Sequence, residues 1–237
     1  MKKKIIKRIF FIVLSVLVIF TGVYIFLSFP MLTMKPVETG QVPCTDIFAI
    51  KNDMNSLFFI ETGNGYIMID AGTNPKKLET SMKETGINAG DVKWTFLTHS
   101  DYDHVAALAM FQNSNVYMSE DELAMVNGTV KRTLFSKNTM PDGIDIDKII
   151  LLKDQQEITC GALKVKCIKT PGHTAGSMVY LVDNRYLFTG DALKITKGKP
   201  GVHPFTMNKE QAKKTIEQMK GIIDSGTIVL TAHYGKL

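Results

Sequence analysis

The chain opens with one long apolar run. Residues 9–29 form an uncharged and almost wholly apolar stretch of 21 residues. A helix of that length, rising about 1.5 Å per residue, can cross a hydrocarbon core of roughly 30 Å, so the run predicts a transmembrane helix. Five cations precede it and favour a cytoplasmic N-terminus, which would place everything from Pro30 onward on the outer side of the cell membrane.

A cleaved signal peptide is the alternative interpretation of this run. The length of the run and the lack of a small-x-small cleavage pattern near residues 28–31 favour an uncleaved, single-pass anchor. If the segment is cleaved, the protein is secreted. Both interpretations predict a domain outside the cytoplasm.

Beyond residue 43, short apolar runs alternate with turn residues. Asn64-Gly65 suits a tight hairpin turn, so the first strands are expected to pair antiparallel. A helix over residues 75–85 is expected to end at Gly86, and a second helix is expected to begin at Val105. The strands expected in this half are residues 47–50, 57–60, 66–69 and 92–97.

The second half has a similar make-up. A strand-rich block covers residues 158–189, a capping box at Asn208 and Gln211 starts an amphipathic helix, and residues 228–231 form a last strand. Strands covered by helices in both halves fit the α/β (α+β) class, as a four-layer αββα sandwich. The expected segments are a basic N-terminus (1–8), the transmembrane helix (9–29), a linker (30–43) and the sandwich domain (44–237), with a short helix and a loop over 119–148 near the site.

Charge and cysteine content narrow the function. The formal net charge is +5, and Lys2, Lys3, Lys4, Lys7 and Arg8 account for all of it, which leaves 23 basic and 23 acidic residues elsewhere. A neutral folded part removes the usual electrostatic argument for nucleic-acid binding, and no nucleic acid is expected as a partner. Three cysteines without a CxxC pair argue against a disulfide framework, and we expect Cys160 and Cys167 to be buried apolar residues.

Candidate metal ligands follow several of the expected strands. His99, Asp101, Asp103 and His104 lie at a strand-to-helix turn, where packed elements fix both ends of the turn. Four of the five histidines belong to this and three later signals, and only His203 lies outside them. Imidazole and carboxylate groups together are typical ligands of divalent metals. The later signals, each at the end of an apolar strand, are His173, Asp191 and His233.

These motifs resemble those of the metallo-β-lactamase-fold superfamily. The family's first motif is His-x-His-x-Asp-His, and the segments 69–72, 170–177 and 189–191 are also similar to those of the family. The resemblance implies the αββα sandwich and a metal-dependent, dinuclear hydrolase. It also implies that His99 and His173 ligate a first metal, that Asp103, His104 and His233 ligate a second, and that Asp191 bridges them.

One position departs from the family motif. Asp101 stands where the family has its second histidine. As a ligand beside His99 and His173, it would make a harder site and shift preference somewhat from zinc towards iron or manganese. The alternative is that Asp101 only orients a neighbour and that the first site is weak or empty. Asp70 is expected to support the site rather than to ligate.

The predicted activity is hydrolysis of a small-molecule ester, lactone, thioester or phosphoester. A bound dication lowers the pKa of water to about 7, and the hydroxide so formed would attack the substrate, with Asp103 as the catalytic residue that orients it. The expected cofactors are two divalent ions, zinc first, with iron or manganese as alternatives. Tyr234 is either a hydrogen-bond donor to the substrate or a packed aromatic, and Lys131-Arg132 either meets an anionic substrate or is a solvated pair.

Two other functions stay open at this point. One is a non-catalytic, membrane-tethered metal-binding or sensory domain, with Asp101 marking lost chemistry. The other is a di-iron oxidoreductase of this fold, which would need a flavin partner that the sequence does not contain. Among the family's hydrolases, the β-lactamase subclasses with a cysteine in place of Asp191 are disfavoured. So are glyoxalase II-type thioesterases, because the chain stops four residues after His233.

Overall fold

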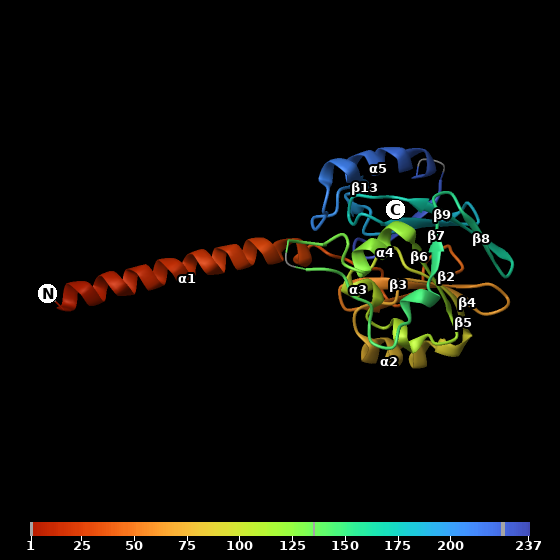
Figure 1. Cartoon of the computed structure of the whole chain (residues 1–237), viewed down its shortest axis with the longest axis horizontal. Coiled ribbons are helices and arrows are strands. Elements are labelled where there is room, and N and C mark those ends of the chain that lie inside the picture. Colours follow the sequence, from red (N-terminus) through yellow and green to blue (C-terminus); the bar gives the residue numbers. More distant parts are fainter. Residues whose placement is uncertain (1, 135, 224–225) are drawn as a thin grey trace. The chain divides into compact units, whose positions relative to one another are not determined.

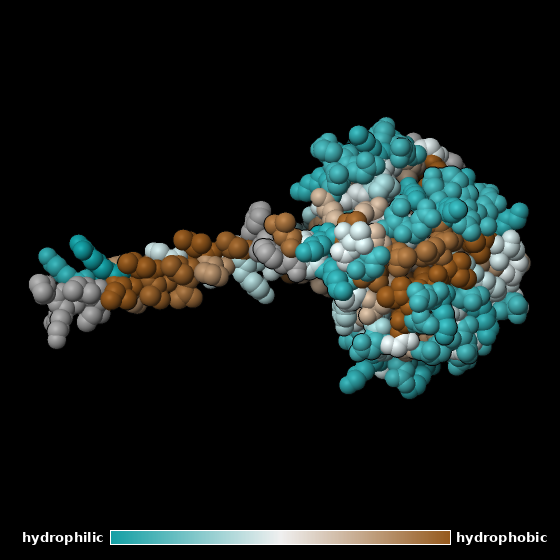
Figure 2. Space-filling model, in the orientation of Figure 1, coloured by the Kyte–Doolittle hydropathy of each residue, from teal (hydrophilic) through white to brown (hydrophobic). Residues whose placement is uncertain are grey.

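The computed structural model describes residues 2–134, 136–223 and 226–237. It divides into two compact units, one up to Met34 and one from Lys35 to Leu237. The first unit consists of helix α1 (Lys2–Leu32), within which Lys7–Ile25 has a mean hydropathy of 2.4 and is not buried inside the structure. Among the described residues, it is the one helix long and apolar enough to cross a membrane, and apolar side chains cover most of its length (Figure 1 and Figure 2).

Two hydroxyl groups inside α1 hydrogen-bond to its own backbone. The Ser15 hydroxyl donates to the carbonyl of Phe11, and the Thr21 hydroxyl donates to the carbonyl of Leu17, each over 2.8 Å. Local bonding of this kind satisfies a polar group without water, as a membrane-spanning helix requires. The helix expected over residues 9–29 is therefore present, and it is longer at both ends than the apolar run.

The second unit begins with a seven-stranded sheet. Its strands are ordered as in the sequence, antiparallel as far as β4 and parallel from β4 to β7. The hairpin expected at Asn64-Gly65 joins β3 to β4. The strands are β1 (Gly40–Gln41), β2 (Ile47–Asn52), β3 (Asn55–Glu61), β4 (Tyr66–Ile69), β5 (Val92–Phe96), β6 (Asn115–Ser119) and β7 (Ile150–Leu152).

A five-stranded sheet packs against the first. Its order is β14-β11-β10-β9-β8, and β11 and β14 are its parallel pair. A separate hairpin, β12 (Lys194–Thr196) and β13 (Lys199–Gly201), leads toward the last helix. The strands of this sheet are β8 (Glu157–Cys160), β9 (Leu163–Lys169), β10 (Met178–Val182), β11 (Tyr186–Gly190) and β14 (Ile228–Thr231).

Helices cover the outer faces of the two sheets (Figure 1). Helix α2 (Pro75–Thr85) lies on the first sheet, begins at the N-cap Asn74 and ends at Gly86, which has the positive φ of 75° that the sequence predicts for a C-cap. Helix α5 (Lys209–Ile223) lies on the second sheet. The shorter helices and turns are η1 (Ala89–Asp91), α3 (Tyr102–Val105), η2 (Leu108–Met110), α4 (Glu120–Val126) and η3 (Ile146–Lys148).

Three buried apolar clusters separate the four layers. The central one lies between the sheets, where the ring of Phe58 is 5.3 Å from that of Phe188 and the ring of Phe96 is 5.1 Å from that of Tyr180. The other two lie under α2 and under α5. Alternating side chains of each strand thus face a core on both sides, which confirms the αββα sandwich.

The helix expected to begin at Val105 is wrong. Helix α3 ends at that residue, and the apolar run that follows forms only the single turn η2. Val105, Leu108 and Phe111 are all buried. Because the run is buried except for the half-buried Ala109 and Met110, it packs as turns against the core and not as an amphipathic helix with a solvated face. The short helix and loop expected over residues 119–148 are present as α4 and the chain after it.

Candidate metal centre

Four loops at one edge of the sandwich bring the predicted ligands together. The first motif follows β5, His173 follows β9, Asp191 follows β11 and His233 follows β14. Strands β9, β11 and β14 run in the same direction, because β9 and β11 are each antiparallel to β10 and β14 is parallel to β11. Their carboxyl ends therefore meet at one edge, and all seven predicted residues lie in overlapping groups whose ligand atoms are within 4.8 Å of one another.

One set of ligand atoms surrounds Oδ1 of Asp191. His233 Nε2 lies 3.3 Å from this oxygen and 3.1 Å from Asp103 Oδ2. His104 Nε2 lies 3.8 Å from the same Asp191 oxygen and 3.6 Å from Asp103 Oδ2. Ligand atoms of a tetrahedral ion with bonds of about 2.1 Å are about 3.4 Å apart, so the spacing fits. We call Asp103, His104, His233 and Asp191 Oδ1 the DHH set.

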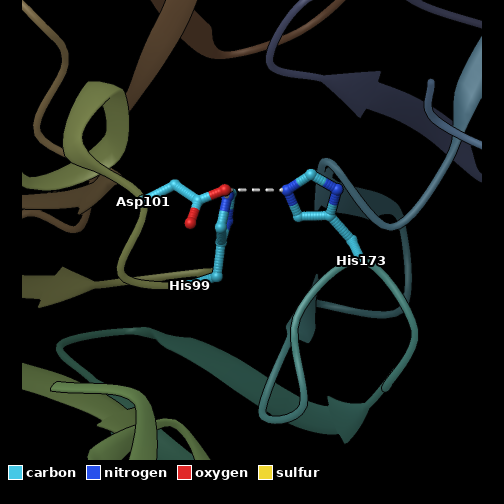
Figure 3. A group of neighbouring side chains, drawn as sticks. All are labelled: His99, Asp101 and His173. Carbon is cyan, nitrogen blue, oxygen red and sulfur yellow. Dashed lines mark hydrogen bonds and ion pairs between the residues drawn. The ribbon is translucent and has the colours of Figure 1, made fainter. Parts of the chain in front are cut away.

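A second set includes Oδ2 of Asp191 and extends through Asp101 to His99. His173 Nε2 lies 3.5 Å from this oxygen and 3.1 Å from Asp101 Oδ2, and His99 Nε2 lies 3.5 Å from the same Asp101 oxygen. Figure 3 shows His99, Asp101 and His173 with their polar atoms directed toward one another. We call His99, His173 and Asp191 Oδ2 the HH set. Asp191 thus presents one oxygen to each set, as a bridging carboxylate does.

The donor atoms of both sets fit divalent cations. His99 Nε2, His104 Nε2 and Asp191 Oδ1 are buried and have no hydrogen-bond partner in the described part of the chain. Buried polar atoms are rarely left without a partner, and one ion at each set would satisfy these three atoms. Imidazole nitrogens together with carboxylate oxygens are also the ligands that zinc, iron and manganese accept.

Groups behind the ligands fix their ring orientations. Asp70 Oδ2 lies 2.9 Å from His104 Nδ1, and Asp70 Oδ1 accepts a hydrogen bond from the amide of Thr98 over 2.8 Å. The carbonyl of Met54 lies 2.6 Å from His233 Nδ1. In each case Nδ1 is the donor, so the lone pair of Nε2 faces the ion position. Asp70 therefore lies behind the ring of His104, one of the predicted ligands.

A buried carboxylate that the sequence did not suggest joins the loops of His99 and His173. Glu122 of α4 is fully buried and accepts hydrogen bonds from the amide and hydroxyl of Ser100, over 2.9 and 2.6 Å, and from the hydroxyl of Thr174 over 2.7 Å. It also accepts from the amide of Gly176 over 3.1 Å, and a Cβ at Gly176 would collide with the backbone of α4. The sequence does not distinguish Glu122 from its neighbours, because it is the third of three successive acidic residues.

Burial and charge shift the histidine pKa values in opposite directions. Burial opposes protonation of His104, but the carboxylates of Asp103, Asp70 and Asp191 raise its pKa to about 9. Burial also opposes protonation of His233, whose pKa Asp191 and Asp103 raise well above its usual value. Without a bound cation, both rings of the DHH set therefore hold protons at neutral pH.

The remaining acids and histidines behave differently. Burial raises the pKa of Asp103, but the charges of His104 and His233 outweigh it and leave the pKa at about 2. Burial lowers the pKa of His173, and it lowers that of His203 to about 3 despite the attraction of Asp191. The rings of His173 and His203 are therefore neutral, in contrast to those of the DHH set.

His203 lies inside this cluster, although the sequence patterns left it outside the candidate ligands. It is 2% exposed, its Nε2 lies 3.5 Å from Asp191 Oδ2, and its ring centroid lies 4.9 Å from that of His173. His203 follows the hairpin β12–β13 instead of a long apolar strand. The strand-end pattern that singled out the predicted ligands is therefore absent at His203.

The interpretation of Arg132 as part of a solvated pair is also wrong. Its Nε donates to both oxygens of Asp101, over 2.9 and 3.1 Å, and a terminal nitrogen donates to the carbonyl of Phe205 over 2.7 Å. Lys131 is exposed, as that interpretation expects. The partners of Arg132 lie 31 and 73 residues away along the chain, beyond the reach of any local pattern.

The segment that precedes β1 is bonded to the C-terminal turn of the centre. The amide of Lys35 donates to the carbonyl of His233 over 2.7 Å, and the hydroxyl of Ser56 donates to the carbonyl of Val37 over 3.0 Å. The ring of Tyr234 packs against His203, with ring centroids 5.6 Å apart. Residues 35–37 therefore form part of the wall around the His233 turn.

Curated proteins similar to this chain include hydrolases. The chain is 29% identical over 174 residues to a protein of Bacillus subtilis (strain 168) named "Probable polyketide biosynthesis zinc-dependent hydrolase PksB", over 72% of this chain and 68% of that protein. It is 37% identical over 101 residues to a "Hydroxyacylglutathione hydrolase" of Glaesserella parasuis serovar 5 (strain SH0165), over 41% of this chain and 34% of that protein.

Solved structures share the fold. A metallo-beta-lactamase of Cronobacter sakazakii with a HARLDQ motif has a TM-score of 0.63 at 20% identity, over 87% of this chain and 82% of that one. The archaeal metallo-beta-lactamase superfamily protein ST1585 of Sulfolobus tokodaii has a TM-score of 0.58 at 22% identity, over 82% of each chain. At this identity the likeness concerns the fold alone. The family model of the metallo-beta-lactamase superfamily matches residues 51–224, and the chain therefore belongs to that superfamily.

Proposed function

We propose that this protein is a membrane-anchored metallo-hydrolase that cleaves a small ester, lactone, thioester or phosphoester. The observation behind this proposal is the position of Asp191, whose two oxygens face two different sets of imidazole nitrogens at 3.3–3.8 Å. Hydrolase relatives such as PksB, named as zinc-dependent, support the reaction class.

The two sets would hold two divalent ions, zinc first, with iron or manganese as alternatives. Asp103, His104 and His233 would bind one ion, His99 and His173 would bind the other, and Asp191 would bridge them. Two side chains, Asp101 and His203, are within reach of the ion in the HH set. A non-catalytic metal-binding domain is the second candidate function, because Asp101, which stands where the family motif has a ligand histidine, is paired with Arg132.

Bound dications would supply Lewis acidity and lower the pKa of water from about 15.7 to about 7. Among the ligand carboxylates, Asp103 is the most open to solvent, with its side chain 38% exposed against 18% for Asp101 and 6% for Asp191. With a pKa of about 2, it stays ionised at neutral pH and can accept a hydrogen bond from the attacking water. Asn55 donates to the carbonyl of Asp103 and so limits the movement of this residue.

The test uses the full-length chain in detergent micelles. Elemental analysis should find bound divalent metal, and the loaded protein should hydrolyse a generic ester or phosphodiester probe. Chelation should abolish turnover, and re-addition of the metal should restore it. The matched variants are Asp103→Asn and, as a control, Asp147→Asn, which changes an exposed carboxylate. Full metal loading without turnover on any probe would favour the binding domain instead.

The location proposed for the domain is the outer side of the cell membrane. The apolar length of α1 and the cations before residue 9 support it. A tag placed after Leu237 should be removed by external protease on intact cells. If the tag is removed only after the membrane is opened, the proposed orientation is wrong.

A further inference from the structure

We infer that His203 is a metal ligand, which completes the HH set in the place that the family motif gives to a histidine at position 101. This inference rests on the proposed function, because it assumes that the centre binds metal. The resulting shell would be His99, His173, His203 and Oδ2 of Asp191. Asp101 would lie outside that shell, paired with Arg132.

The backbone holds the loop of His203 against the loop of His173. The amide of Met207 donates to the carbonyl of His173 over 3.1 Å, and the amide of Asn208 donates to the carbonyl of Gly172 over 2.9 Å. These two bonds close the loop between β13 and α5 onto the turn after β9. Main-chain contacts therefore fix the position of the His203 loop relative to His173.

The distances around Asp191 Oδ2 suit a single ion. His173 Nε2 and His203 Nε2 each lie 3.5 Å from this oxygen, and the three residues form one group whose ligand atoms are within 4.8 Å of one another. A tetrahedral ion with bonds of about 2.1 Å separates its ligands by about 3.4 Å. The same distances are too long for a strong hydrogen bond between an imidazole N–H and a carboxylate, which is about 2.7–2.9 Å.

The ring of His203 also lacks other polar contacts. It is 2% exposed, and neither of its nitrogens has a hydrogen-bond partner in the described part of the chain. Burying an imidazole without a partner is costly, and buried polar groups are almost always satisfied. A cation at the common focus of His203, His173 and Asp191 gives Nε2 the partner it lacks.

Asp101, by contrast, is already satisfied. Its Oδ1 accepts from Arg132 Nε over 2.9 Å and from Asn138 Nδ2 over 3.0 Å, and its Oδ2 lies 3.1 Å from both Arg132 Nε and His173 Nε2. A terminal nitrogen of Arg132 lies 3.4 Å from His173 Nε2. As a metal ligand, Asp101 would have to share its oxygens with Arg132, whose permanent positive charge weakens the carboxylate as a donor to a cation.

The Asp101–Arg132 pair has a structural use in this arrangement. Arg132 donates to the carbonyl of Phe205, two residues after His203. Asp101 thus orients the guanidinium that holds the His203 loop. The carboxylate at the motif position would act as a positioning residue, while a histidine from another loop restores three imidazoles to the shell. Such a nitrogen-rich shell favours zinc over the harder ions that an Asp101 ligand would favour.

The test is a metal titration of the full-length chain in detergent with Zn²⁺, and with Co²⁺ for its visible absorption bands. We compare the wild type with His203→Ala, with the aromatic but non-ligating His203→Phe and with Asp101→Asn, which can still accept a hydrogen bond from Arg132. Val202→Ala is the control for a change in the same loop. Thermal unfolding of each variant confirms that it is folded.

We expect two metal equivalents in the wild type, Asp101→Asn and Val202→Ala. Both His203 variants should bind the second equivalent about 100-fold more weakly or worse, beyond the usual loss for a contact outside the shell. They should also lose the Co²⁺ bands that appear with the second equivalent. Loss of that equivalent in Asp101→Asn, with retention in both His203 variants, overturns the inference. A wild type that binds no metal refutes the proposed function itself.

Discussion

The DHH and HH sets of the metal centre differ in how the chain supports them. In the DHH set, Asp70 and the carbonyl of Met54 lie directly behind the rings of His104 and His233. In the HH set, His99 Nδ1 contacts the hydroxyl of Thr98 over 3.0 Å, but Nδ1 of His173 has no partner in the described residues, and the four hydrogen bonds that Glu122 accepts join the two loops. The set in which every histidine ring has an acceptor behind it keeps the residues of the family motif. The site fixed through its loops is the one where a motif residue has changed, since a loop can bring in a ligand from elsewhere.

The largest expected effect removes the residue that both sets share. In Asp191→Ala, each ion loses a ligand, and metal binding at both positions should fall together. Hydrolysis should then drop by about 10³-fold or more, because metal-ion catalysis contributes several kcal/mol to transition-state stabilisation. Elemental analysis and the ester probe measure the two losses. If one ion stays fully bound in this variant, the two sets do not share Asp191.

Asp70→Asn should weaken metal binding at the two sets to different extents. The amide can still accept from Thr98 but holds the His104 ring less firmly, so the affinity of the DHH ion should fall by about 10–100-fold. The ion in the HH set should be affected less, by about threefold, because Asp70 reaches His99 only through the hydroxyl of Thr98. Metal titration followed by calorimetry resolves the two binding steps. Equal losses in both steps would contradict the assignment of Asp70 to one set.

Glu122→Gln should have the converse effect, at a smaller magnitude. The substitution would place two amide N–H donors among the donors of Ser100, Thr174 and Gly176, which should destabilise the fold by about 1–3 kcal/mol. The affinity of the HH ion should fall by about tenfold, because loops and not rings are displaced. Denaturant unfolding and metal titration measure these changes. Glu120→Gln, an exposed acid on the same turn, is the control and should leave both unchanged.

The two ions should also differ in proton release. The pKa of His104 is raised to about 9, so below pH 9 the ring is protonated and the ion must displace that proton. The pKa of His233 is raised as well, so the affinity of the DHH ion should fall as the pH drops below about 9, by about tenfold per unit for each proton displaced. The rings of His173 and His203 have lowered pKa values, so they should release no proton to the HH ion at neutral pH. Calorimetry in two buffers of different ionisation enthalpy counts the protons. Equal numbers of released protons for the two ions would contradict this difference between the histidine pKa values.

Residues with a local signal were predictable from the sequence. His173, Asp191 and His233 each follow an apolar strand, and the order of strands and helices fixes which strand ends share an edge. The N-cap Asn74 and C-cap Gly86 fixed the bounds of α2 in the same way. Such features depend on neighbours within a few positions, so a sequence pattern contains them.

Residues that act through distant partners were not predictable. Glu122 lies in an acidic turn whose other two members are exposed, and only the fold shows which of the three is buried. Arg132 meets Asp101 across 31 residues, and His203 enters the centre from a hairpin without a strand signal. The prediction of a helix from Val105 onward was wrong for a related reason. Nearly all side chains of this apolar run are buried, so the run has no alternation of apolar and polar positions to detect.

The hydrogen bond from Lys35 to His233 bears on how a soluble form of the protein should be designed. A form of the chain that begins near the end of α1 lacks the apolar segment and keeps this bond. A shorter form that starts at β1 loses the bond together with the Val37 contact to Ser56, and with them one wall of the C-terminal turn. Proteolytic removal of α1 would meet the same boundary, and cleavage before Lys35 is the cut that keeps the bond to His233.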